Sequence, residues 1–136
     1  MTYTLPVLII SLGIIIAILH SYALAHHLYF SIWWFDLLVH FLSGMLIVLF
    51  SISILLQFYD PSLLGSPSYP LLLQAVLAAI IIGTVWETFE LIFRLVLTDL
   101  LTYISDTASD MMMNIIGACA GYAFGIWHVR KRAAHG

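Results

Sequence analysis

Residues 35–58 have the sequence FDLLVHFLSGMLIVLFSISILLQF. A transmembrane helix needs about 20 mainly apolar residues, so this run is long enough to cross a bilayer. Its ionisable residues are Asp36 and His40, which lie one helical turn apart near its start. The run therefore predicts a membrane-spanning helix that carries two ionisable side chains near one end.

The rest of the chain has the same character. Of its 136 residues, 63% are hydrophobic and 8% are charged, and the mean hydropathy is +1.10. Soluble domains are about a quarter charged, so this chain lacks the polar residues to cover a globule. Three further apolar runs occupy about residues 5–24, 71–97 and 107–128. We therefore predict an all-α, polytopic integral membrane protein, a bundle of four transmembrane helices that forms a single domain over residues 1–136.

Composition and breaker residues narrow the class of protein further. The segment YDPSLLGSPSYP at residues 59–70 is rich in proline, which predicts a loop between the second and third spans. The net charge of −3 and the lack of a basic stripe exclude nucleic-acid binding. The one cysteine, Cys119, excludes a disulfide framework.

The orientation prediction rests on the basic residues Arg130, Lys131 and Arg132. The positive-inside rule places this segment in the cytoplasm, and an even number of spans places the N-terminus there too. We therefore expect a multi-pass protein of the cell membrane with both termini cytoplasmic.

Glycines recur on the fourth span. Gly117, Gly121 and Gly125 form two overlapping GxxxG spacings. Small residues at this spacing let helix backbones approach closely in lipid. We expect this face to pack against another helix, and it could serve a second copy of the chain or a membrane partner.

Most polar residues within the spans fall in one leaflet under this topology, the extracytoplasmic one. Spacings of three and four keep each set on one face of its helix. A charge at the bilayer centre costs at least about 2.5–3.5 kcal/mol, so such residues are functional candidates. The residues are His20, Asp36, His40, Glu87, Glu90, Arg94, Asp106, Asp110 and Asn114.

The charges in this group do not balance, because five carboxylates face one cation, Arg94. Carboxylates crowded in a low dielectric cannot all stay ionised, so they must hold protons or cations. Two divalent cations would neutralise the excess, and a mostly oxygen ligand set suits Mg²⁺ or Mn²⁺ better than Zn²⁺. The predicted metal ligands are Asp36, His40, Glu87, Glu90, Asp106, Asp110 and Asn114, and the predicted catalytic residues are Asp36, His40, Glu87 and Asp110.

Four of these residues also have a purely structural interpretation. Asp106 could cap the fourth helix, where a carboxylate complements the N-terminus. Glu90 and Arg94, one turn apart, could form a structural ion pair. His20, on an apolar face, could be a hydrogen-bonded packing residue.

Three motifs resemble known proteins. DLLVHFLSG (36–44), WETFE (86–90) and SDTASDMMMNIIGACAG (105–121) are similar to the pattern of VanZ-like and YjdF-type inner-membrane proteins. The resemblance covers roughly the last hundred residues. VanZ-like proteins commonly have Glu-x-x-Gln where this chain has Glu87 and Glu90. The resemblance implies a membrane topology and a set of polar positions, without an established reaction.

Three functions are compatible with these residues. The first is a metal-dependent membrane hydrolase or transferase that acts on a lipid-linked phosphate or a cell-envelope intermediate. The second is a proton-coupled transporter that uses the acids and His40 as a relay. The third is a non-enzymatic assembly or accessory subunit whose polar cluster holds helices together.

Overall fold

The computed structural model describes residues 4–58, 69–93 and 100–133, and within them it contains helices and no strand. Four of the helices are long and apolar enough to cross a membrane, which confirms the predicted all-α fold with four spans. The helices are α1 (Thr4–His26), α2 (Leu28–Ser31), α3 (Phe35–Phe58), α5 (Tyr69–Phe93) and α6 (Leu100–Ala133).

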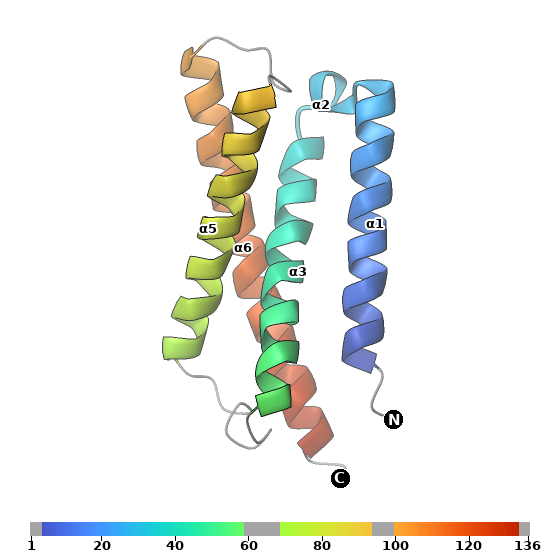
Figure 1. The fold of residues 1–136 in the computed structure, drawn as a ribbon, viewed down its shortest axis with the longest axis vertical. Helices are drawn as coiled ribbons and strands as arrows, with labels where there is room; N and C mark the ends of the chain where they lie inside the picture. Colours follow the sequence, from blue (N-terminus) through green and yellow to red (C-terminus); the bar gives the residue numbers. More distant parts are fainter. Residues whose placement is uncertain (1–3, 59–68, 94–99, 134–136) are drawn as a thin grey trace.

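The long helices alternate in direction along the chain (Figure 1). The start of α1 and the end of α6 therefore lie at the same end of the molecule, as an even number of spans requires. The start of α3, the end of α5 and the start of α6 lie at the opposite end. The polar residues of all these segments are thus carried to one end of the bundle.

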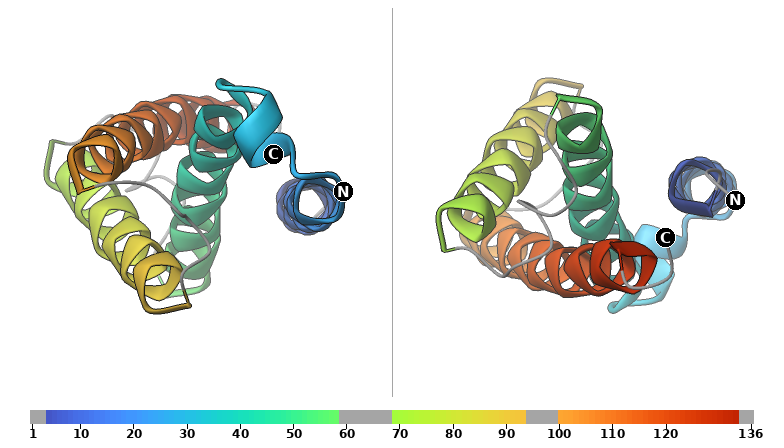
Figure 2. Two further views of the ribbon diagram at one scale, coloured as in Figure 1. Left: turned by 90° about the horizontal axis from the view of Figure 1, so that it is seen from above. Right: turned by 90° about the horizontal axis from the view of Figure 1, so that it is seen from below.

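The four long helices are not equivalent in their packing. Figure 2 shows α3, α5 and α6 around a three-sided core, with α1 outside it. Helix α1 packs mainly on α3, and its lipid-facing side chains include Ile10, Ile14 and Ile18, each more than half exposed. A helix that is apolar all round has no preferred face, so the sequence of α1 does not reveal this peripheral position.

Helices α3 and α6 make the most extensive contact in the bundle. A Cβ atom on Gly44 would overlap the backbone oxygen of Asn114, and one on Gly117 would overlap the backbone oxygen of Phe41. A Cβ on Gly121 would lie 2.8 Å from the backbone oxygen of Met45. The two backbones therefore approach as closely as glycine allows.

This packing corrects one prediction about partners. Gly117, Gly121 and Gly125 are all buried, and α3 occupies the face that they form. The prediction that this face binds a second copy or a membrane partner is wrong, because the helix within the same chain already fills it. The GxxxG spacing signals close packing without specifying which helix comes close.

Helix α6 is longer than its apolar run. Its 34 residues correspond to about 51 Å, well beyond the roughly 30 Å of a bilayer core, and it crosses the bundle obliquely (Figure 1). Because α6 begins at Leu100, Asp106 lies inside the helix. Its interpretation as an N-terminal cap is therefore wrong, since no breaker residue ends the helix between Leu100 and Asp106. Arg94 and the predicted end of the third span, residues 94–97, lie outside the described residues.

Candidate metal site at the polar end of the bundle

Three ionisable side chains converge between α3 and α6. Asp36 and His40 lie one turn apart on α3, and Asp110 reaches them from α6. One ligand atom from each of the three lies within 4.8 Å of the others, and His40 Nε2 is 3.5 Å from Asp36 Oδ1. The glycine contacts described above bring α6 close enough to α3 for this convergence.

Asp110 is the most deeply buried acid of the group. Its residue exposure is 1%, and its Oδ1 has no hydrogen-bond partner among the described residues. A carboxylate in such a position costs several kcal/mol unless a charge or a proton compensates it. Asp110 therefore needs a proton or a nearby positive charge to remain buried.

Glu87 adds a third carboxylate beside Asp36, His40 and Asp110. Its Oε1 lies 3.6 Å from His40 Nε2, and no side chain or backbone group in the described ranges forms a hydrogen bond with it, although the residue is only 5% exposed. Its Oε2 accepts a hydrogen bond of 2.9 Å from the hydroxyl of Thr107 on α6. The carboxylate is thus held by one oxygen and leaves the other facing His40.

Two further predicted ligands lie beside this cluster rather than in it. Glu90 is buried, and its Oε1 accepts a 2.8 Å hydrogen bond from the indole nitrogen of Trp86. Asp106 is half-buried and interacts electrostatically with Asp36 and Glu87. Both add negative charge around the cluster. The ion pair predicted between Glu90 and Arg94 falls on a residue outside the described range.

Asn114 lies one turn beyond Asp110 along α6 and forms a hydrogen bond to α5. Its Nδ2 donates a 3.2 Å hydrogen bond to the backbone oxygen of Ala79 on α5. Its Oδ1 is buried, has no hydrogen-bond partner within the part of the chain that the structure describes, and occupies the space that a Cβ atom on Gly44 would need. The amide therefore joins α6 to α5 at the point where α3 and α6 are closest.

His20 of α1 belongs to a hydrogen-bonded aromatic group. Its Nδ1 lies 2.6 Å from the hydroxyl of Tyr29 on α2, and its ring centroid lies 5.2 Å from that of Trp86, with the two rings nearly perpendicular. Burial raises the pKa of the Tyr29 hydroxyl, and the carboxylates of Asp36 and Glu90 raise it further. Tyr29 therefore stays protonated, and His20 has the hydrogen-bonded packing role considered for it.

Sequence reasoning missed three residues of this region. Thr107 and Trp86 hold the carboxylates of Glu87 and Glu90, and Tyr29 orients His20. Helical spacing would have indicated one of them, because Trp86 lies four residues before Glu90 on one face. Thr107 and Tyr29 act across helices, and no spacing within one helix reveals such partners.

The geometry of Asp36, His40 and Asp110 fits a cation. A Mg²⁺ ion holds its ligands at about 2.0–2.1 Å, so opposite ligands are about 4.2 Å apart. Ligand atoms within 4.8 Å of one another can therefore reach one ion by shifts of less than about 1 Å. The lysine and arginine side chains that the structure describes are those of Lys131 and Arg130. Both lie at the end of the bundle opposite to the cluster. His40 is thus the described side chain that could carry positive charge within the cluster.

Comparisons with known proteins place the chain in one family. A search of curated proteins and a search of solved structures each found no match. The family model described as "Predicted membrane protein (DUF2238)" matches residues 1–131. The match spans the four long helices, except for the last two residues of α6, and every residue of the candidate site. The chain therefore belongs to this family of membrane proteins.

Proposed function

We propose that the chain is a metal-dependent membrane enzyme, a hydrolase or transferase that acts on a lipid-linked phosphate or another cell-envelope intermediate. The observation that carries the proposal is the convergence of Asp36, His40 and Asp110, together with buried oxygens of Asp110 and Glu87 that have no hydrogen-bond partner among the described residues. A purely structural cluster would satisfy those oxygens, because each orphaned buried polar group destabilises the fold.

The charge balance supports a cation rather than protons alone. Asp36, Glu87 and Asp110 approach one imidazole, and Glu90 and Asp106 add to the negative potential. One protonated His40 could offset one carboxylate, whereas a divalent cation offsets two and accepts their oxygen atoms as ligands. Carboxylates suit Mg²⁺ and Mn²⁺, and the additional imidazole favours Mn²⁺ within that pair.

The residues have separate roles in this proposal. Asp36, His40 and Asp110 hold the cation. A divalent cation in this position supplies charge that neutralises phosphate oxygens and acidifies water. Glu87 accepts a proton at Oε1, the oxygen that faces the cluster, while Thr107 keeps Oε2 in place. Glu90 and Asp106 lie outside the group of three ligands, where they make the electrostatic potential of the site more negative without binding the cation.

The basic residues Arg130 and Lys131 lie at the opposite end from the cluster. With these residues in the cytoplasm, the site faces the extracytoplasmic leaflet of the cell membrane. The resemblance of the three motifs to VanZ-like and YjdF-type proteins agrees with such a site, because those motifs contain Asp36, His40, Glu87 and Asp110.

Elemental analysis of the gently purified full-length protein tests this proposal. We expect stoichiometric divalent metal in the wild type and its loss in Asp36→Asn and Asp110→Asn. Asp106→Asn is the matched control, because it removes a carboxylate one turn from Asp110 and should retain the metal. Metal-free wild-type protein whose stability is unaffected by Asp36→Asn and Asp110→Asn would refute the metal site.

An accessory subunit is the second candidate, because several polar contacts join helices without needing a ligand. Thr107 holds Glu87 across α6 and α5, and Asn114 joins α6 to Ala79. This function predicts that Thr107→Val and Asn114→Leu lower stability in protein that never contained metal. The metal content of the wild type separates the two candidates.

A transporter finds less support in the described part of the chain. A second cavity of about 290 Å³ lies between α3 and α5, nearer the end of the bundle at which α1 begins and α6 ends. Its polar lining residues are Ser51 and Gln74. Neither side chain titrates near neutral pH, so neither continues a proton relay from the carboxylates. Uptake into liposomes driven by a pH gradient and abolished by Glu87→Gln would reverse this ranking.

A further inference from the structure

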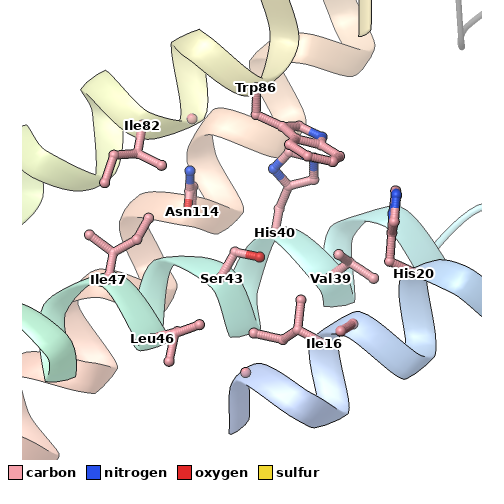
Figure 3. Close-up of a pocket in the computed structure, with 13 residues that line it drawn as sticks. Ile16, His20, Val39, His40, Ser43, Leu46, Ile47, Ile82, Trp86 and Asn114 are labelled. Carbon is pink, nitrogen blue, oxygen red and sulfur yellow. The ribbon is translucent and has the colours of Figure 1, made fainter. Parts of the chain in front are cut away.

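A groove of about 360 Å³ lies between α1, α3 and α5 and reaches α6 at its floor (Figure 3). This volume falls within the roughly 300–1,000 Å³ of ordinary ligand pockets. Small residues on α1 create the space, because Gly13 and Ala17 line that side of the groove. A Cβ on Gly13 would meet one atom, Leu46 Cδ2, at 3.9 Å, so the groove is open beside it.

The two ends of the groove differ in polarity. His20, His40 and Trp86 lie at one end, and Leu46 and Ile47 lie at the other. His40 also belongs to the carboxylate cluster, at 3.5 Å from Asp36 and 3.6 Å from Glu87. Ile47 follows His40 by seven positions on α3, so the two residues are about 10 Å apart along the helix axis. The groove therefore leads from the candidate metal site into an apolar slot directed toward the bilayer centre.

The surroundings of the groove determine what can fill it. Helices α1 and α5 flank it, and they are not among the helix pairs in extensive contact. Figure 2 shows α1 standing apart from α5. The side chains of Ile82 and Ala17 line the groove and are exposed. Since all of these segments span the membrane, the groove opens sideways to lipid, and hydrocarbon is the material available to occupy it.

We propose that this groove binds one hydrocarbon chain of a membrane lipid whose phosphate group lies at the His40 end. The lipid reaches it from the same leaflet, between α1 and α5, below the contact of His20 with Trp86. The arrangement matches the polarity of such a lipid, because the polar groups lie toward the end of the bundle and the apolar slot lies deeper. This inference rests on the proposed function and specifies how the substrate is held.

Photolabelling in liposomes tests the groove directly. The probe is phosphatidic acid with a diazirine in the middle of one acyl chain, diluted in phosphatidylcholine vesicles that contain the full-length protein. Mass spectrometry of the labelled chain should show severalfold more label on the groove residues Ala17, Leu46 and Ile82 than on Ile14, Ile18 and Ile81. The latter three lie at similar depth and are exposed outside the groove. Equal labelling of both sets would mean contact with annular lipid only and would overturn the proposal.

Two substitutions that fill the groove, and one control outside it, test whether the label depends on the groove itself. Ala17→Phe and Gly13→Leu each fill the groove from α1 and should remove most of the groove label. Ile18→Phe adds an aromatic ring to the lipid-facing side of the same helix and should leave the label unchanged. Loss of label in Ile18→Phe but not in Ala17→Phe or Gly13→Leu would overturn the proposal.

The position of the phosphate group is tested by comparing two lipid probes. A diacylglycerol with the same diazirine chain lacks the phosphate and should label the groove less than phosphatidic acid does. Equal labelling would overturn the position of the phosphate beside His40. If the wild type contains no metal and Asp36→Asn and Asp110→Asn leave its stability unchanged while groove labelling persists, the metal site is refuted and the chain-binding groove stands.

Discussion

The closest approach in the bundle can be tested by adding single methyl groups. In Gly44→Ala and Gly117→Ala the new Cβ would overlap a backbone oxygen of the facing helix. A backbone atom cannot rotate away as a side chain can, so α3 and α6 must separate. Overpacking of this kind costs about 1–3 kcal/mol. In Gly13→Ala, by contrast, the new Cβ meets Leu46 Cδ2 at 3.9 Å, which is ordinary contact.

The expected magnitudes follow from these contacts. Gly13→Ala should raise the free energy of unfolding by up to about 1 kcal/mol, because alanine favours the helix over glycine. Gly44→Ala and Gly117→Ala should lower it, leaving a gap of about 2–4 kcal/mol between them and the control. Gly121→Ala, with a Cβ at 2.8 Å from Met45 O, should fall between these values.

The separation of the helices should also reach the candidate metal site. Gly44 lies one turn beyond His40 on α3, and Gly117 lies two turns beyond Asp110 on α6. Moving α6 away from α3 draws Asp110 out of reach of the other two residues, so both variants should bind metal more weakly. Circular dichroism during a titration with sodium dodecyl sulfate measures unfolding, and elemental analysis measures the metal. A free energy of unfolding for Gly44→Ala equal to that for Gly13→Ala would refute the close packing of α3 and α6.

Added Mn²⁺ should stabilise the wild type by about 2.7 kcal/mol at a concentration of 100 times the dissociation constant, and thermal unfolding should show no such gain in Asp110→Asn. Thr107→Val should cost about 1–3 kcal/mol by leaving a buried oxygen of Glu87 without a partner, whereas the exposed Thr88→Val, which loses a bond within its own helix, should cost less in the same assay. The pKa of Tyr29 is above its ordinary value of 10.0, so the stability linked to this group is complete below about pH 10 and is lost as the pH rises toward the folded-state pKa. Ultraviolet absorbance titration should therefore show a late-ionising tyrosine that disappears in Tyr29→Phe.

The span boundaries show how far local sequence can be interpreted. The second span matches its predicted limits, 35–58, because aromatic residues and breakers surround a clear apolar run. The connection between the first and second spans has no such marker, because residues 26–32 include neither glycine nor proline. There the chain turns at His27, which adopts a left-handed backbone with φ of 54°. The start of α6 was also misplaced, because residues 100–106 are less apolar than a typical span and still continue the helix.

The candidate site was predictable as a set of residues and not as a geometry. Charge is expensive in lipid, so each acid within a span was identified from its position alone. Which acids meet depends on how the helices rotate about their axes. The structure joins Asp36, His40 and Asp110 and leaves Glu90 and Asp106 outside the group.

The sequence of this protein by itself determines the membrane class, the four spans and the gathering of acids at one end, because each of these depends on residue type and count along the chain. Only the tertiary structure decides that α1 stands outside the core, that α3 covers the glycines of α6, and that a groove connects His40 to the lipid. The physical reason is that apolar side chains gain little by choosing one apolar neighbour over another in a bilayer. Helix partners are therefore selected by close packing and by buried polar contacts, and these depend on three-dimensional fit.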